Sequence, residues 1–491
     1  MLLRATPPLA LILMLGPLAP AFANTIELVK VVDDAGAIVD AVAIPGAGNE
    51  TKLLTLSLNG QVSVIDRAET DMNARTDPQF TNIQPGGEAL GAGDSPIGIA
   101  LAADFETTGH FYVSTVLRTD DPASPARNVI ERYTLDVNGP PVDGASGVPV
   151  ASIDYPEETV VDHRGGAIDV DDNGFIWFTT GEGDSAFSGP DAGARDQVQN
   201  ETTILGSVFR IDPSGDDFAD PLNNWAVPEG NVGAGNGPKS LTDGIVARGL
   251  RNPFKLKIDG NNVLIADVGE FDREEVNRFR IDEDLFDPTV DDPNTFQLPN
   301  YGWPFREGDI AGPDTGVFPP GTLETDPFYV YAHGNGPFDG FSVTGGIVGR
   351  DLDPALAALE GLYVFGDFGG FPLSVPQVEQ VWTIDPDSQP AGFATATLWE
   401  LLFPEDDGPI GRLIAFAMDG SGVIYLSGLT DIGTQSGNLF AVTQVTAAEV
   451  PLPPAMLLLA GGLGLLVVNR ASGLRSRSSS RDRSQRRAIP R

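Results

Sequence analysis

Short apolar stretches alternate with turn residues along most of the chain, and one unit recurs. Each copy has an apolar strand, a turn that contains Asp, Asn or Gly, and a second strand rich in aromatic and β-branched residues. A D-x-x-G or N-G turn between two alternating strands is typical of a β-hairpin. We therefore predict six hairpins. They span residues 53–66, 97–116, 166–184, 255–269, 345–367 and 412–428.

The number and spacing of these units favour an all-β fold, a six-bladed β-propeller. Spacings of roughly 45–90 residues fit four-stranded blades with loop insertions. A β-sandwich, or two smaller β domains, is the alternative, but sandwich domains rarely repeat one hairpin six times. No segment has the pattern of a long helix, and residues 354–362 are expected to form one short turn at most. The propeller is predicted to occupy residues 24–446.

The composition agrees with a turn-rich β protein and excludes some kinds of site. Of the 491 residues, 58 are Gly and 40 are Pro, and the 41% that are hydrophobic are spread through the body of the chain. That distribution argues against disorder. The chain has no Cys, so disulfides and thiolate metal sites are excluded. Zinc would need carboxylates and the three histidines, His110, His163 and His333, which is a weak case.

The net charge of −39 is unevenly distributed along the chain. Eight arginines lie between residues 470 and 491, so the body is more acidic than the chain as a whole. An acidic body repels nucleic acid and anionic membrane surfaces, and we expect no nucleic-acid partner. It suits a secreted protein and the binding of cations, although most of these carboxylates are expected to form a solvated surface.

Both ends of the chain have the layout of targeting signals. Residues 1–23 combine an early Arg, an apolar stretch and Ala-Phe-Ala before Asn24, which predicts a signal peptide. A membrane anchor is the alternative, but the apolar run is short and interrupted by Pro. We therefore expect an exported protein, in the periplasm, at the cell surface or outside the cell.

The C-terminal segment, residues 447–491, has three parts. A Pro-containing motif at 450–455 precedes an apolar run at 456–468, predicted to be a short transmembrane helix, and then an Arg/Ser-rich tail. This order resembles the VPLPA/PEP-type sorting signals of Gram-negative bacteria. The resemblance implies transient anchoring in the membrane and an exosortase-type processing enzyme as a partner. A plain C-terminal anchor is the alternative.

The first motif with chemical potential is D-H-R-G-G at residues 162–166. His163 is suited to accept a proton near neutral pH, and the glycines after it let a ligand approach the backbone closely. On its own a single His is more often structural. The same unit ends in the acidic loop G-E-G-D at residues 181–184.

The second motif is G-L-R-N-P at residues 249–253. Arg251 offers a planar fork of donors for carboxylates or carbonyls, and Asn252 adds an amide beside it. Pro253 biases Asn252 toward an extended conformation. The alternative is that Arg251 is a simple ion-pair partner in an acidic body.

Two further motifs follow along the chain. Residues 266–277 (ADVGEFDREEVN) are rich in acids and amides, the hard oxygen ligands that Ca²⁺ prefers, but they do not form an EF-hand loop. Residues 300–304 (NYGWP) form a compact aromatic turn followed by Glu307. Core packing is the alternative explanation for the Tyr and Trp of this turn.

The order of these motifs carries a family resemblance. The series H-x-G-G, G-x-G-D, L-G-S-V-F-R-I-D, G-L-R-N-P, D-V-G-x-x-x-x-E-E-V-N and N-Y-G-W-P continues through Gly345-Gly346, Y-V-F-G-D-F at 363–368 and G-R-L at 411–413. In this order it resembles the soluble PQQ-dependent glucose/sorbosone dehydrogenase family, and within it the aldose sugar dehydrogenases. The resemblance is strong over residues 163–428. Two positions, Arg164 and Val268, depart from residues that are frequent in the family.

The resemblance implies a PQQ-dependent enzyme that oxidises an aldose to a lactone. It assigns the general base to His163, which takes the C1 hydroxyl proton while a hydride passes to the quinone. It assigns PQQ binding to Arg251 and Asn252, with Arg412 and Arg350 as further basic residues near the cofactor. The implied partners are a sugar or other small polyol and an external electron acceptor.

The resemblance also implies Ca²⁺ as a cofactor. Main-chain carbonyls of Gly269 and Glu270 would bind the active-site ion, which polarises the quinone as a Lewis acid. A second, structural ion would draw on Glu274 and Glu275.

Two other functions remain open from the sequence. A non-catalytic propeller, displayed or secreted as a binding module, would share the scaffold and the sorting tail without binding a cofactor. A metal-dependent lactonase on another six-bladed propeller is disfavoured, because G-L-R-N-P together with N-Y-G-W-P is typical of the dehydrogenases.

Overall fold

The computed structural model describes residues 24–33, 36–69, 81–85, 90–91, 93–117, 126–135, 147–155, 163–183, 195–234, 237–292, 295–369, 380–404, 410–431 and 435–448. The predicted signal peptide and nearly all of the predicted sorting signal lie outside these residues. Contacts divide the chain into two units, and every described strand belongs to the unit Ala23–Thr446. Within the described ranges, no helix has the length and apolar character needed to cross a membrane.

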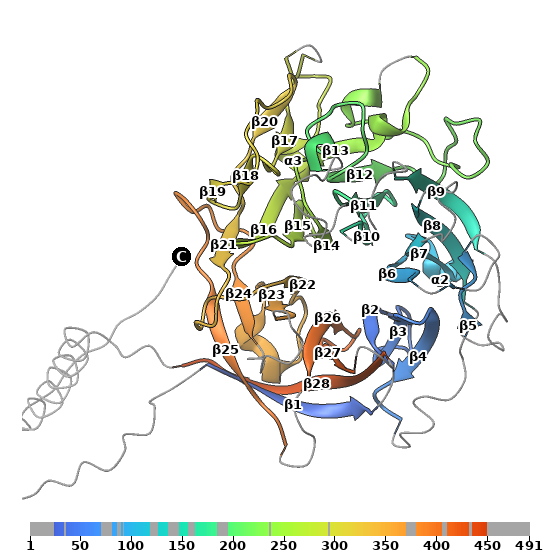
Figure 1. Ribbon diagram of the computed structural model, residues 1–491. Helices are drawn as coiled ribbons and strands as arrows, with labels where there is room; N and C mark the ends of the chain where they lie inside the picture. Colours follow the sequence, from blue (N-terminus) through green and yellow to red (C-terminus); the bar gives the residue numbers. More distant parts are fainter. Residues whose placement is uncertain are drawn as a thin grey trace, which may run out of the picture. The chain divides into compact units, whose positions relative to one another are not determined.

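The fold is a β-propeller, in which sheets stand around a central axis (Figure 1). Two sheets of four strands come first in the chain. They are β2 (Ile38–Ala43), β3 (Lys52–Ser57), β4 (Gln61–Asp66) and β5 (Thr81–Asn82), and then β6 (Ser95–Leu101), β7 (His110–Leu117), β8 (Arg127–Thr134) and β9 (Val148–Asp154).

The next two sheets occupy the middle of the chain. One has six strands in the order β10 (Gly165–Val170), β11 (Ile176–Thr180), β12 (Ser207–Ile211), β13 (Ile245–Arg248), β17 (Leu298–Asn300) and β20 (Thr322–Glu324). The other has four, β14 (Pro253–Asp259), β15 (Asn262–Asp267), β16 (Arg273–Arg280) and β21 (Tyr329–Ala332). A small hairpin, β18 (Arg306–Glu307) with β19 (Ile310–Ala311), lies in the connection between β17 and β20.

The last sheet has eight strands and contains both ends of the propeller. Its order is β22 (Val343–Val348), β23 (Tyr363–Asp367), β24 (Val381–Ile384), β25 (Thr397–Leu402), β1 (Thr25–Val32), β28 (Ser436–Thr446), β27 (Ile424–Asp431) and β26 (Arg412–Met418). Strand β1 pairs antiparallel with β28, so the first described strand closes the ring against the last. The predicted count of six blades stays a prediction, because parallel pairing of β1 with β25 joins two four-stranded stretches in one sheet.

Helical structure is sparse among the described residues, as the sequence predicts. The segments are α2 (Phe105–Thr108), α3 (Ile281–Asp284) and the 3₁₀ turns Arg195–Gln197, Val232–Ala234, Leu241–Gly244 and Pro354–Leu359. The last of these is the short turn expected at residues 354–362.

All six predicted hairpins are confirmed as antiparallel strand pairs. They are β3–β4, β6–β7, β10–β11, β14–β15, β22–β23 and β26–β27. Five of them begin with the innermost strand of their sheet. The exception is residues 53–66, where β2 is innermost and the predicted hairpin is the second strand pair.

The innermost strands β2, β6, β10, β14, β22 and β26 pack in that order around the axis, and β26 returns to β2 (Figure 1). Central strands such as β11 and β15 are buried along their whole length. A continuous apolar run predicts this double burial, because each sheet is covered on both faces by its neighbours. Large side chains such as Trp177, Trp225 and Trp382 fill the space between sheets.

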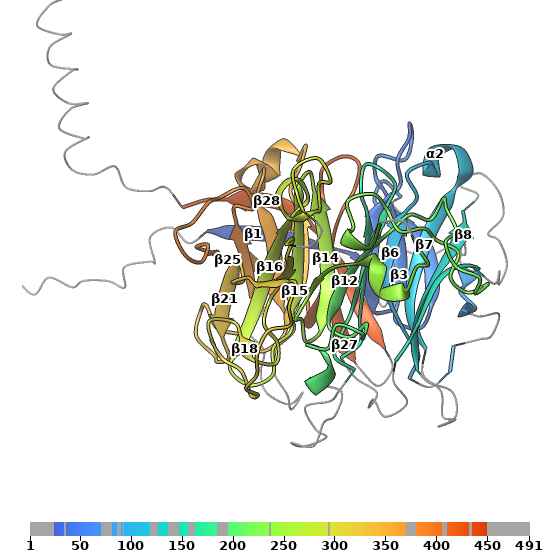
Figure 2. The ribbon, with the colours of Figure 1, turned by 90° about the horizontal axis from the view of Figure 1, so that it is seen from above.

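The strands run between two ends of the ring, which Figure 2 shows from the side, with α2 at one end and β18 at the other. We call the end where β10, β14, β22 and β26 begin the site end. The end with the turns 171–175, 259–262 and 419–423 is called the turn end. Seven-residue strands such as β14 separate the two ends by roughly 20 Å.

Candidate active site

His163 lies at the site end in a strained turn just before β10. Its φ is +55°, in the left-handed region that a non-glycine residue rarely adopts, and Gly165 and Gly166 follow with φ of +64° and +97°. The two glycines accept these angles without a Cβ clash, but His163 does so at a cost. Such strain is common at functional sites, and here it aims the imidazole at two neighbouring loops.

Two charged side chains flank the imidazole. Its Nδ1 lies 3.2 Å from Oε1 of Glu182, and its Nε2 lies 3.5 Å from Nη2 of Arg251. An ionised carboxylate only accepts and a guanidinium only donates. The neutral imidazole that fits this arrangement carries its proton on Nδ1 and a lone pair on Nε2. The side chain is 18% exposed, so His163 can be reached from outside.

Glu182 is the buried partner that fixes this tautomer. Besides His163, it accepts a hydrogen bond of 2.5 Å from Nε1 of Trp303, and Nε of Arg251 lies 3.4 Å from its Oε1. Burial acts to raise the pKa of Glu182, but the hydrogen bond with His163 and the charge of Arg251 outweigh it and lower the pKa. The carboxylate is therefore ionised at neutral pH.

Main-chain hydrogen bonds lock the three loops together. Glu182 N–H donates to the carbonyl of Arg251 at 2.7 Å, and Gly183 N–H donates to that of His163 at 2.8 Å. Gly165 N–H donates to Oδ1 of Asn252. Gly181 must lack a side chain, since a Cβ there would lie 2.1 Å from the carbonyl oxygen of His163. The loops before β10 and β14 and after β11 therefore behave as one assembly.

Asp267, at the end of β15, holds the Arg251–Asn252 backbone. Its Oδ2 accepts from Arg251 N–H at 2.9 Å and its Oδ1 from Asn252 N–H at 2.7 Å. Burial raises the pKa of Asp267 to about 7. The neighbouring carboxyl of Glu275 is also buried, and burial together with the charge of Asp267 raises its pKa.

The guanidinium of Arg251 also contacts the loop predicted to bind calcium. Nη1 donates to the carbonyls of Val268 and Gly269 at 2.9 and 2.5 Å. Gly269 is required in this tight turn, because a Cβ would lie 1.6 Å from the carbonyl oxygen of Arg273. The Glu270 side chain turns to Arg195, whose Nη1 lies 2.9 Å from its Oε2.

The two other predicted calcium ligands lie on β16, and each has a protein partner. Glu274 is fully buried; its Oε1 lies 2.7 Å from Nε2 of His333, and its Oε2 accepts from Val343 N–H. Glu275 accepts from the amide of Asn277. In the part of the chain that the structure describes, no three His, Asp or Glu side chains converge as a metal site.

The two remaining arginines lie at opposite ends of the ring. Arg412 begins β26 at the site end, buried, with its guanidinium 5.1 Å from the ring centre of Phe368. Arg350 follows β22 and donates to Asp259 at 2.9 Å, at the turn end of β14. The structure thus does not bring Arg350 to the group around His163, because seven residues of β14 separate Asp259 from Arg251.

Three residues of this cluster were not assigned a role from the sequence. Glu182 lies in a loop noted only as acidic. Asp267 lies in the acid-rich motif 266–277 without a role of its own, and Trp303 lies in the aromatic turn for which core packing is the alternative explanation. The order of motifs alone contains a weak signal for them, since each stands in a motif of the series. Their convergence depends on how the ring brings separate strand ends together.

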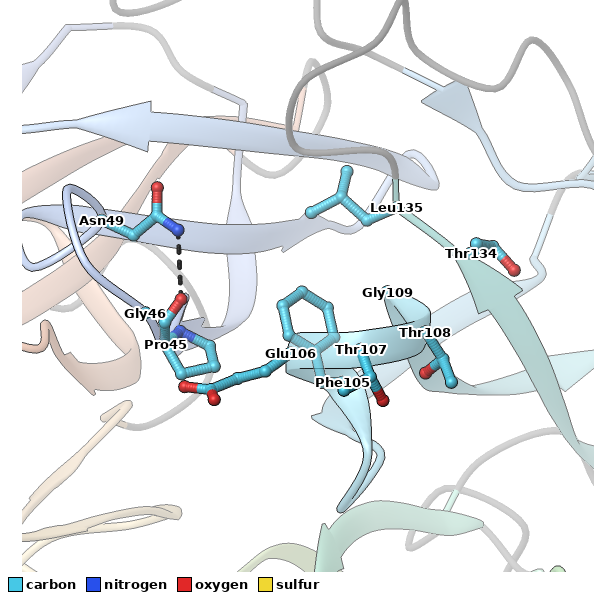
Figure 3. Close-up of a pocket in the computed structure, with 10 residues that line it drawn as sticks. All are labelled: Pro45, Gly46, Asn49, Phe105, Glu106, Thr107, Thr108, Gly109, Thr134 and Leu135. Carbon is cyan, nitrogen blue, oxygen red and sulfur yellow. Dashed lines mark hydrogen bonds between the residues drawn. The ribbon is translucent and has the colours of Figure 1, made fainter.

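A different cavity lies away from this cluster, at the turn end, between the β2–β3 connection and α2 (Figure 3). It measures about 560 Å³. None of the predicted site residues lines it. The lining residues are Pro45, Gly46, Asn49, Phe105, Glu106, Thr107, Thr108, Gly109, Thr134 and Leu135.

The protein is thus a β-propeller with a cluster of His163 and the buried Glu182 and Arg251 at its site end. A family model described as Glucose / Sorbosone dehydrogenase matches residues 47–308, more than half of the chain. The chain therefore belongs to the glucose/sorbosone dehydrogenase family. The predicted enzyme class, a sugar dehydrogenase, is confirmed at the level of the family.

Solved structures support the fold. The PQQ-bound aldose sugar dehydrogenase from Streptomyces coelicolor has 19% identity and a TM-score of 0.55, with 87% of this chain and 100% of that chain covered. The apo-form of the soluble aldose sugar dehydrogenase from Escherichia coli has 16% identity and a TM-score of 0.57, with 85% and 99% covered. At these identities the likeness concerns the architecture of the chain.

Proposed function

We propose that the protein is a PQQ- and Ca²⁺-dependent dehydrogenase that oxidises an aldose to its lactone outside the cytoplasm, with His163 as general base. The observation that carries the proposal is the contact of His163 with Glu182 and Arg251 at the site end. Family membership supports the reaction class, and the PQQ-bound relative supports the choice of cofactor.

The residues at the site end fit a polyanionic quinone. PQQ has three carboxylates, so a protein that binds it needs cations that are partly desolvated. Arg251 and Arg412 are both buried at this end, and Asn252 adds an amide next to Arg251. These three residues would hold the cofactor. Arg350 is left out of this group because it is paired with Asp259 at the turn end.

The donor set also fits a hard cation. Main-chain carbonyls are ordinary Ca²⁺ ligands. The Gly269 carbonyl lies at the site end, where it accepts a hydrogen bond from Nη1 of Arg251. By the family resemblance, Gly269 and Glu270 would supply carbonyl ligands for the active-site ion. The second, structural ion at Glu274 and Glu275 has less support, because both carboxylates already have protein partners.

The chain's own residues would handle the proton. When bound, PQQ supplies the hydride acceptor and Ca²⁺ increases its electrophilicity. Nε2 of His163 takes the proton of the sugar C1 hydroxyl, while Glu182 accepts from Nδ1–H and stabilises the imidazolium that forms. The buried position of Glu182 keeps this interaction strong because little water screens it.

Other parts of the proposal concern the location and the partners of the protein rather than the site. Export by the signal peptide, an external electron acceptor, and sorting by an exosortase-type enzyme with transient anchoring all rest on the sequence. They are consistent with an oxidoreductase that acts on sugars outside the cytoplasm.

Reconstitution of the purified full-length protein tests the proposal. PQQ and Ca²⁺ are titrated into the protein, quinone absorbance reports binding, and dye reduction is measured with a panel of aldoses. We expect saturable binding at micromolar PQQ and turnover with at least one aldose. No binding at that concentration contradicts the proposal, and retention of a polysaccharide ligand without PQQ binding indicates the binding module instead.

A pair of arginine variants sharpens the same experiment. Arg412→Ala is expected to weaken PQQ binding about 10- to 100-fold, the usual value of a charge-assisted hydrogen bond. Arg280→Ala serves as the matched control, because Arg280 pairs with Asn262 at the turn end of β16. Equal PQQ affinities in the two variants would remove Arg412 from the proposed site.

A further inference from the structure

One carboxylate oxygen holds the whole turn between β15 and β16. Oε1 of Glu307 accepts hydrogen bonds from the N–H groups of four consecutive residues, 270 to 273, at 2.8, 2.8, 3.0 and 3.2 Å. Glu307 itself is 5% exposed. Successive N–H groups that converge on one anion form a nest, a strong and geometrically specific arrangement.

The nest fixes the direction of the carbonyls on the other side of each peptide plane. In a trans peptide, the C=O of one residue points opposite to the N–H of the next. The N–H groups of Glu270 and Phe271 point at Glu307, so the carbonyls of Gly269 and Glu270 point away from it. For Gly269 this is observed directly, since its carbonyl oxygen meets Nη1 of Arg251.

Glu307 is rigidly placed to do this. It belongs to the short β18–β19 hairpin, and the neighbouring Asp309 forms an ion pair of 2.6 Å with Nε of Arg273 at the far end of the turn. Four residues earlier in the chain, Trp303 donates to Glu182. One segment, residues 303–309, therefore contacts both the partner of the proposed base and the proposed calcium loop.

We propose that Glu307 is the positioning residue of the calcium site, orienting the carbonyls of Gly269 and Glu270 through hydrogen bonds on the opposite side of their peptide planes. The inference rests on the proposed function, because the ion is part of it. Glu307 does not itself contact the ion. It acts by holding the loop in the geometry that lets two carbonyls face the same side.

Ca²⁺ affinity and amide exchange, measured on the full-length protein, test this role. Glu307→Gln keeps an oxygen acceptor and removes the charge, and Glu307→Ala removes both. We expect Ca²⁺ alone, titrated by calorimetry, to bind about 10- to 100-fold more weakly, the usual loss when a residue that supports metal ligands is changed. Hydrogen–deuterium exchange of the amides of residues 270–273 is expected to become faster, more so in Glu307→Ala.

Asp419→Asn provides the matched control. Asp419 is a buried carboxylate that also accepts main-chain N–H groups, those of Ser421 and Val423, but at the turn end. It should leave both Ca²⁺ affinity and exchange of residues 270–273 unchanged. If Glu307→Ala does not fold, Glu307→Gln carries the test, because its amide oxygen can still accept from the turn.

The outcomes separate this inference from the proposed function. Unchanged Ca²⁺ affinity in a folded Glu307→Gln variant overturns the positioning role, even if exchange becomes faster, since Glu307 would then only stabilise the turn. Unchanged exchange overturns it as well. An unmodified protein that binds PQQ but no Ca²⁺ overturns the calcium site and the inference together, whereas the first two results leave the proposed function standing.

Discussion

The two ends of the ring use buried carboxylates in different ways. At the turn end, Asp171 accepts main-chain N–H groups of its own turn and the indole N–H of Trp177 six residues later. Asp419 repeats this arrangement, with the hydroxyl of Tyr425 in place of the indole. At the site end, Glu182 instead joins an imidazole, a guanidinium and an indole that come from three other segments.

The turn-end carboxylates stabilise the turns in which they lie, whereas Glu182 orients groups of the proposed active site. A turn-end carboxylate completes its own hairpin, so the same arrangement can recur wherever the D-x-x-G sequence recurs. Its distant contact is an ion pair, of Asp419 with Arg67 at 3.2 Å and of Asp171 with Arg210 at 3.8 Å. A site-end carboxylate depends on the positions of several sheets, and its partners are groups that can take or stabilise charge. Substitutions at the two ends should therefore have effects of different kinds.

The largest expected effect is a loss of turnover when Glu182, the site-end carboxylate, is changed. Glu182→Gln keeps the size of the side chain but removes the charge that would stabilise protonated His163, so kcat should fall on the order of 10³-fold. Asp419→Asn should keep turnover and lower the free energy of unfolding by about 1–3 kcal/mol, because it weakens a buried turn. Steady-state kinetics and urea unfolding of both variants check this, and similar kcat values in the two would contradict it.

Two glycines give the next largest contrast. Gly181→Ala places a methyl group against the carbonyl of His163 and should lower the free energy of unfolding by about 3 kcal/mol. Gly260 has φ of +56° but open space around its Cβ position. Gly260→Ala should therefore cost only the backbone strain, about 1 kcal/mol. Denaturant unfolding measures both losses, and an equal loss would mean that the three loops are not locked together.

The last expected effect is on the pH dependence of stability. Burial raises the pKa of Asp267 to about 7 and that of Asp367 to about 6, so the folded protein keeps protons that the unfolded chain releases near pH 4. Burial acts to lower the pKa of His333, but its hydrogen bond with Glu274 outweighs burial and raises it. The stability that His333 contributes is therefore also lost as pH rises. Stability should fall as pH rises from about 4 to about 7.

The expected loss is roughly 3 to 4 kcal/mol for each such carboxyl over that interval. Glu182 does not oppose it, because a lowered carboxyl pKa affects stability only in more acidic solution. Thermal unfolding across the interval, with Asp267→Asn as a variant that should flatten the profile, measures the effect. Constant or rising stability would show that these carboxyls are ionised in the folded protein.

The same contrast explains what the sequence could predict. The hairpins follow from apolar alternation and D-x-x-G turns, which are local, and all six strand pairs are present. The motif order singled out His163, Arg251 and Asn252, because it carries information about the family, and the structure brings these three residues into one cluster. Arg350 shows the limit of that information, since the motif order does not reveal which end of a strand a side chain occupies.

Glu182 and Glu307 could not be assigned for a related reason. Each follows a strand or turn whose pattern is clear, but its partners lie between 19 and 121 residues away along the chain. The β10–β11 hairpin brings His163 to Glu182, whereas Trp303 and residues 270–273 reach their partners only through the tertiary fold. The parallel pairing of β1 with β25 is another example, because the sequence pattern of neither segment indicates it.

The most direct test of the central claim is a comparison of cofactor binding with turnover in His163→Ala. The variant keeps Arg251, Asn252 and Arg412, so it should bind PQQ with Ca²⁺ about as tightly as the unmodified protein. Its kcat with the best aldose should fall by about 10²- to 10⁴-fold, the usual contribution of a general base. Unimpaired turnover with PQQ bound would contradict the role of His163.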